Sequence, residues 1–258
     1  MKKSIIYFIV FLGLQATASI IVTGCWRLIT GNSDITTTNL IVTSVLSSGL
    51  TIALFLLARW AVVSPNWLRS RQWTVLIWSV IAAMGTIIPS MWIQEHMPDL
   101  PNLLENEFDQ LLSSRMGYFT LALLAPLAEE IVFRGAVLKA LLGSYRPWTA
   151  IIVSAVFFAL AHLNPAQMPH AFAIGLLLGW MYYRTGSILP GMAYHWFNNS
   201  VAYVLYNVYP DPDIRLADIF KGSEQHVLMA VGFSLLILVP ALYQLYLRMK
   251  TAEQQSFF

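Results

Sequence analysis

Two adjacent carboxylates and an arginine lie inside an apolar stretch of this sequence. Glu129, Glu130 and Arg134 fall near the middle of an apolar run over residues 117–142, which is long enough to cross a bilayer as a helix. An ionisable group at that depth costs roughly 2.5 to 3.5 kcal/mol on insertion scales and is interpreted first as functional. On a helix Glu130 and Arg134 share a face and can pair, whereas Glu129 points about 100° away. The alternative is a buried ion pair that only fixes helix packing.

Two further polar pairs occur in later apolar runs. Phe158 and His162 are four residues apart, and so are His195 and Asn199, so that each pair shares a helix face. Taken alone, either pair also fits a packing role, because histidine and asparagine form hydrogen bonds between membrane helices.

Together these side chains match the needs of amide hydrolysis. A carboxylate and an imidazole can activate water, directly or through a metal such as zinc, and a second histidine with an asparagine can stabilise an oxyanion. We therefore predict that Glu129, His162 and His195 line one cavity that opens towards the cytoplasmic half of the membrane.

The three motifs resemble those of the CAAX protease and bacteriocin-processing family of intramembrane endopeptidases, also called CPBP or Abi. Residues 129–134 are similar to its EExxxR signature, residues 158–162 to its FxxxH motif and residues 195–199 to its HxxxN motif. They follow the family's order over about residues 115–205, which we take as the catalytic core.

The resemblance implies an endopeptidase of the metalloprotease grouping. Glu129 and His162 would activate the attacking water, with Glu130 and Arg134 supporting the site. His195 and Asn199 would stabilise the oxyanion. If a metal takes part, its ligands would be Glu129, His162 and His195; these residues suit zinc without demanding it, and a metal-independent glutamate base is the alternative. The expected substrate is a peptide or a lipid-anchored or membrane protein.

Composition places the chain in a membrane. Apolar residues make up 57% and charged residues 11%, against about 25% charged in soluble proteins. Nothing in the sequence indicates a nucleic-acid partner or specifies an oligomeric state. The single cysteine, Cys25, excludes a disulfide within the chain and a cysteine-rich metal site.

The apolar runs predict an all-α, polytopic bundle of about eight transmembrane helices. They cover residues 4–24, 39–58, 73–93, 117–142, 148–163, 170–183, 187–205 and 227–247. The sixth run has about 14 residues, too few for an upright span. We thus expect one transmembrane domain over residues 1–258, with short or broken helices around a central polar cavity.

The distribution of positive charge predicts that both termini are cytoplasmic, since cytoplasmic loops collect lysine and arginine. With eight helices, eleven of the 15 basic residues fall on that side. The exceptions are Arg27, Arg115, Arg215 and Lys221. The start of the chain is typical of a bacterial inner-membrane protein, with the first run as an uncleaved helix. A cleaved signal, or a lipobox ending at Cys25, is the alternative.

Two other classes of function fit parts of the pattern. A proton-coupled transporter would use buried Glu, His and Arg as a relay. Such transporters often carry paired repeats, however, and here the polar groups lie in the second half alone. A catalytically silent immunity or scaffold protein would keep the motif residues for binding.

Overall fold

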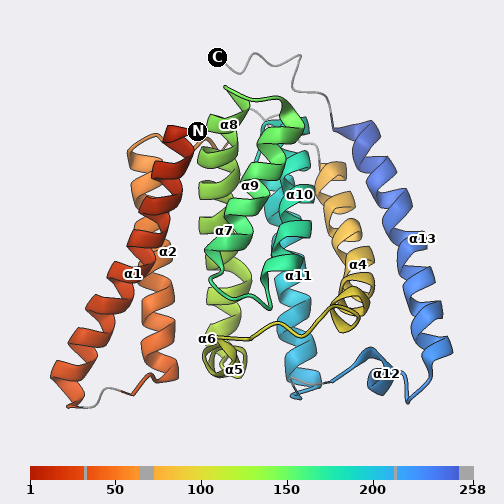
Figure 1. The fold of residues 1–258 in the computed structure, drawn as a ribbon, viewed down its shortest axis with the longest axis horizontal. Helices are drawn as coiled ribbons and strands as arrows, with labels where there is room; N and C mark the ends of the chain where they lie inside the picture. The colour runs from red at the N-terminus through yellow and green to blue at the C-terminus, as the bar shows by residue number, and fades with distance from the viewer. Residues whose placement is uncertain (32–33, 64–72, 212–213, 250–258) are drawn as a thin grey trace. The chain divides into compact units, whose positions relative to one another are not determined.

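The computed structural model describes residues 1–31, 34–63, 73–211 and 214–249 (Figure 1). Its elements are all helices, and this part of the chain contains no strand. Arg69, Arg71 and Lys250, which the sequence assigns to the cytoplasmic side, lie outside the described residues. The all-α prediction is confirmed for this part of the chain.

Four helices are long and apolar enough to cross a membrane. They are α1 (Lys2–Thr30), α2 (Thr37–Leu57), α4 (Trp73–Glu95) and α13 (Glu224–Arg248). Only 17% to 22% of their most apolar windows is buried inside the protein. An apolar surface of that extent is stable in lipid and costly in water. These helices correspond to the first, second, third and eighth predicted runs.

The central predicted helix is one continuous helical segment with two π-helical parts. It comprises α6 (Arg115–Tyr118), η1 (Phe119–Leu124), α7 (Ala125–Glu129), η2 (Glu130–Leu138) and α8 (Lys139–Leu142). The π register is visible in the backbone hydrogen bonds, because the Ala125 N–H donates to Thr120 O and the Lys139 N–H to Arg134 O, five residues back. The sequence predicts the helix but not these π segments, which are rare and frequently occur at functional sites.

The next three helices are α9 (Pro147–Ala161), α10 (Met168–Thr185) and α11 (Leu189–Val208). The length predicted for the sixth run is wrong, since α10 has 18 residues. It begins one residue before Pro169. Proline is tolerated in the first turn of a helix, because the backbone N–H that it lacks would have no partner within the helix.

Two short helices lie between the predicted apolar runs. They are α5 (Glu105–Leu112) and α12 (Leu216–Ile219). In α5 the acidic side chains Glu105 and Glu107 lie in the first turn, where their negative charge interacts favourably with the helix dipole. Leu111 of this helix is buried.

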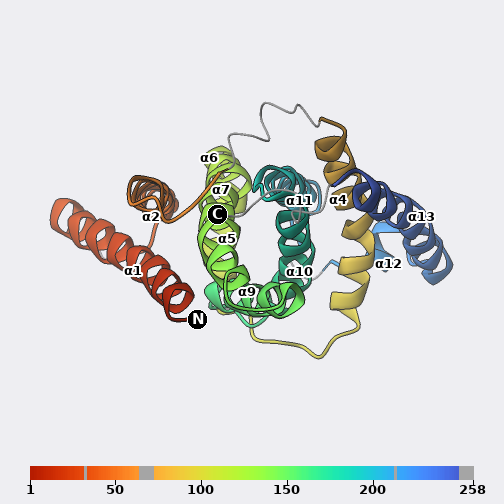
Figure 2. The same cartoon turned by 90° about the horizontal axis from the view of Figure 1, so that it is seen from above.

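The chain divides into two compact units, each built from separate stretches of sequence. Unit 1 comprises Met1–Val63 and Pro101–Trp180, and unit 2 comprises Ser64–Leu100 and Met181–Phe258. In unit 1, α1 packs against α2 and η2, and α9 packs against η2 (Figures 1 and 2). Close approach of α10 to α9 depends on Gly175, where an added Cβ would lie 3.0 Å from the Ala155 Cβ.

In unit 2, α4 packs against α13 and α11 (Figure 2). The α4–α13 contact needs a glycine, because a Cβ at Gly85 would lie 2.7 Å from the backbone nitrogen of Leu238. The Tyr194 hydroxyl of α11 and the Thr86 hydroxyl of α4 are 2.6 Å apart. Thr86 Oγ1 donates to Ala83 O, so Tyr194 is the donor in the bond between the helices.

We expect Gly85→Ala to destabilise the protein by about 1 to 3 kcal/mol, because the added methyl group overpacks the α4–α13 contact. Gly232→Ala, on α13, is the matched control, since a Cβ there meets nothing within 4 Å. Thermal unfolding in detergent would measure both. Equal melting temperatures for the two variants would contradict the close approach.

Candidate active site

Glu130 and Arg134 form the buried ion pair that their spacing predicts. Arg134 Nη1 donates to Glu130 Oε1 at 2.8 Å. Glu130 is 0% and Arg134 1% exposed, and every residue of η2 is buried. Removing one partner of such a pair leaves an uncompensated buried charge, which makes the two side chains mutually dependent.

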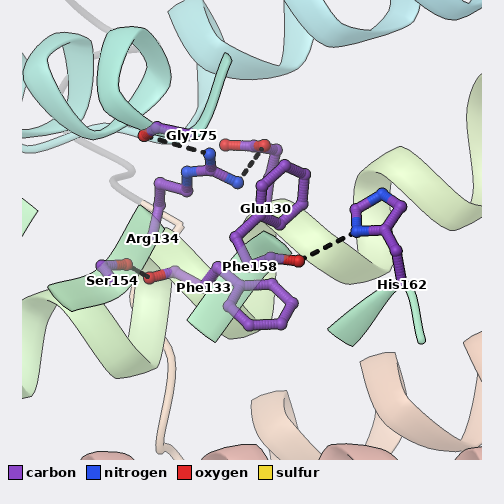
Figure 3. Close-up of polar contacts among 7 residues, drawn as sticks. All are labelled: Glu130, Phe133, Arg134, Ser154, Phe158, His162 and Gly175. Atoms are coloured by element: carbon purple, nitrogen blue, oxygen red, sulfur yellow. Dashed lines mark hydrogen bonds and ion pairs between the residues drawn. The ribbon is translucent and has the colours of Figure 1, made fainter. Parts of the chain in front are cut away.

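Arg134 also contacts the two helices that pack beside η2. Its Nη2 donates to the Gly175 carbonyl of α10 at 3.5 Å, and its guanidinium lies 4.4 Å from the centroid of the Phe158 ring of α9 (Figure 3). One side chain therefore joins three helical segments of unit 1.

Glu129 has a different environment from Glu130. It ends α7, is half-buried rather than fully buried, and interacts electrostatically with Arg134. The structure thus separates the two carboxylates: Glu130 takes the hydrogen bond from the arginine, and Glu129 is the more accessible of the two.

His162 is oriented by the backbone of its own helix. Its Nδ1 lies 2.9 Å from Phe158 O, and its ring packs edge-on to the Phe158 ring at 5.0 Å (Figure 3). A carbonyl oxygen only accepts hydrogen bonds, so Nδ1 is the protonated nitrogen and Nε2 of the neutral ring keeps its lone pair. The Phe158 ring therefore contacts both Arg134 and His162.

Three hydrogen bonds from outside the helix reach the carbonyls of η2. Ser154 Oγ of α9 donates to Phe133 O at 3.2 Å, the Val62 N–H to Gly135 O at 3.3 Å, and Ser4 Oγ of α1 to Val137 O at 3.4 Å. These donors come from three different segments of unit 1. The sequence does not reveal them, because a serine in an apolar helix has many other uses and the Val62 donor is a backbone N–H.

His195 and Asn199 lie on α11, in unit 2. His195 is 5% exposed and Asn199 is half-buried, and the neighbouring Tyr194 is anchored to α4 through Thr86. The structure therefore brings Glu129, Glu130, Arg134 and His162 into one region of unit 1. The convergence of His195 and Asn199 on that region stays a prediction.

The predicted metal ligands are divided between the two units. Among the described residues of either unit, no three His, Cys, Asp or Glu side chains are grouped closely enough to bind one ion. Zinc sites in proteins use three or four such ligands. Within unit 1, Glu129 and His162 supply two of the three predicted ligands, and His195 of unit 2 is the third.

A profile of the Rce1-like type II CAAX prenyl endopeptidases matches residues 112–201. Residues 112–201 form an Rce1-like domain. The domain contains all six predicted site residues and lies close to the range 115–205 that the resemblance covers, which confirms the resemblance. Because the family is one of endopeptidases, the domain points to a protease. Comparison with curated proteins and with solved structures gives no match.

The contribution of the Glu130–Arg134 ion pair to the stability of the protein can be measured. We expect Glu130→Ala to lower the free energy of unfolding by roughly 3 to 5 kcal/mol, because Arg134 is left buried and uncompensated. Adding Arg134→Met should recover part of that loss, since the buried charge is then removed as well. Denaturant unfolding in detergent would measure both variants.

The matched control is Glu105→Ala, which removes an exposed carboxylate from α5. It should change stability by less than about 0.5 kcal/mol. A Glu130→Ala protein as stable as this control would show that the ion pair does not stabilise the packing of unit 1.

Proposed function

We propose that this protein is an intramembrane endopeptidase that hydrolyses a peptide bond in a membrane-associated protein or peptide. The observation that carries the proposal is the division between the two glutamates of the Rce1-like domain. Glu130 is fully buried against Arg134, while Glu129 is half-buried in the same region as His162, whose Nδ1 is bonded to Phe158 O.

The first chemical step is activation of water. Glu129, with His162 Nε2 as its partner, takes a proton from a water molecule as the water oxygen attacks the carbonyl carbon of the substrate. A positioned general base contributes typically 10²- to 10⁴-fold to such a step. Arg134 fixes Glu130 through the ion pair and contacts the Phe158 ring, which in turn packs against His162.

The second step is collapse of the tetrahedral intermediate. Its oxyanion accepts hydrogen bonds from His195 and Asn199, a contribution of roughly 3 kcal/mol per donor in known cases. The proton held by Glu129 passes to the amide nitrogen, the C–N bond breaks, and an acid and an amine leave. This step requires the convergence of α11 on unit 1 that the motifs predict.

The membrane setting follows from the same proposal. We place eight helices of one domain around a central polar cavity, with both termini in the cytoplasm of a bacterial cell and the chain in the inner membrane. Four long apolar helices support this arrangement. A cavity open to the cytoplasmic half would receive lipid-anchored or membrane-inserted substrates from the lipid itself.

Cleavage by the purified protein tests the proposal. We expect Glu129→Gln, His162→Gln and His195→Gln each to reduce the rate of peptide cleavage by at least about 100-fold, because each removes a group that touches the reacting atoms. The assay is mass spectrometry of a library of membrane-anchored peptides incubated with protein in liposomes.

The controls remove the same side chains from exposed sites. Glu105→Gln and His226→Gln should cleave at the wild-type rate. No cleavage by the wild type would favour a silent scaffold, and proton-driven uptake without cleavage would favour a transporter. Wild-type rates in the three site variants would refute the hydrolytic site.

A chelator distinguishes the two ways of activating water. Retained cleavage after 1,10-phenanthroline treatment is the result expected of the glutamate base. Loss of cleavage that added zinc restores would instead assign Glu129, His162 and His195 as metal ligands. Both results keep the same residues at the site. They differ in whether Glu129 acts as a general base or as a metal ligand.

A further inference from the structure

The helix that carries His162 ends in a strained turn. α9 ends at Ala161, His162 is its C-cap, and Leu163 follows with φ of 51°. Glycine and asparagine adopt this left-handed conformation readily, whereas it is unfavourable for leucine. The Leu163 N–H donates to Leu160 O at 3.2 Å, so the turn is closed by hydrogen bonding. Strain of this kind persists only where the surrounding structure holds it.

The side chain of Asn164 provides that hold. Asn164 is 0% exposed. Its Oδ1 accepts a hydrogen bond from the Leu103 N–H at 3.0 Å, and its Nδ2 donates to Asn102 Oδ1 at 2.8 Å. The Asn164 carbonyl accepts from the Gln167 N–H at 3.0 Å. One buried amide thereby ties the end of α9 to a segment 61 and 62 residues away in sequence.

The direction of the His162 ring depends on the same turn. Its Nδ1 bond to Phe158 O spans the last turn of α9, and its ring packs against the Phe158 ring with an interplanar angle of 89°. If the turn at Leu163 opened, the last residues of α9 could unwind, and a backbone rotation at His162 would then move the imidazole away from both partners. A fixed orientation of His162 Nε2 therefore requires that the turn at Leu163 stays closed.

We propose that Asn164 is a positioning residue for His162. Its two side-chain hydrogen bonds hold the left-handed turn at Leu163. The held turn keeps His162 Nδ1–H hydrogen-bonded to Phe158 O and directs the Nε2 lone pair at the reacting water. The proposal rests on the hydrolytic function above, because it is water activation that requires a fixed Nε2.

Asn39 shows how a buried asparagine without this role differs. It lies on α2 of the same unit and is 3% exposed. Its Nδ2 has no hydrogen-bond partner within the described part of the chain. Asn39→Ala therefore removes a buried amide without touching the His162 turn, and it serves as the matched control.

The direct test is the tautomer of His162, measured by NMR of protein labelled with ¹⁵N-histidine in detergent micelles. The chain has five histidines, so the spectrum of His162→Gln assigns the signal. We expect one tautomer with Nδ1 protonated in the wild type and in Asn39→Ala. In Asn164→Ala we expect averaged shifts from a mixture of tautomers. A wild-type signal in Asn164→Ala would overturn the proposal.

Variants at Asn102 keep the test decisive if Asn164→Ala does not fold, because Asn102 is exposed and its loss is tolerable. Asn102→Ala removes the bond to Asn164 Nδ2 and should shift the signal towards the mixture. Asn102→Asp keeps an acceptor and should retain the wild-type signal. Identical spectra for Asn102→Ala and wild type would also overturn the proposal.

Kinetics separate positioning from a general loss of structure. We expect Asn164→Ala to lower kcat by roughly 10- to 100-fold with KM within about twofold of wild type, as for a misplaced catalytic group. A raised KM with unchanged kcat would contradict the role. If the wild type cleaves nothing, the hydrolytic function fails, and the NMR readout still shows whether Asn164 orients His162.

Discussion

A charge pair sealed in apolar surroundings determines how this domain is built. Arg134 and Glu130 meet at 2.8 Å with almost no exposed surface, and a buried charge is stable only when its partner and its other polar contacts are present. The contacts of Arg134 with the Gly175 carbonyl and the Phe158 ring place α9 and α10 around η2. Because Phe158 also contacts His162, the candidate imidazole is positioned indirectly by the same arginine.

The pair also explains why two glutamates stand side by side. A single carboxylate cannot both neutralise a buried arginine and serve as an accessible base, because the first role requires a fixed hydrogen bond and the second requires contact with water. Glu130 is fully buried against Arg134, and Glu129 is half-buried one residue earlier, where α7 meets η2. The change of helical register between the two residues coincides with their change of role in our proposal.

Much of this arrangement follows from the sequence, and the remainder has a physical reason for being hidden. Lengths of apolar runs predict the long helices, and spacings of four residues predict the contacts of Glu130 with Arg134 and of Phe158 with His162, because these depend on local geometry. The donors that reach the carbonyls of η2 belong to Ser4, Val62 and Ser154, which are distant in sequence. The hydrogen bonds of the Asn164 side chain to Leu103 and Asn102 are also long-range, so no local sequence pattern reveals them.

Our proposal requires that Glu129 and His162 of unit 1 share one site with His195 of α11. The most direct measurement is cross-linking of Glu129→Cys with His195→Cys by a short bifunctional maleimide, in a Cys25→Ser background that leaves no other cysteine. We expect an intramolecular link, mapped by mass spectrometry, that is absent when Val45→Cys on the exposed face of α2 replaces Glu129→Cys. A yield for the Glu129 and His195 pair no higher than for that control would contradict it.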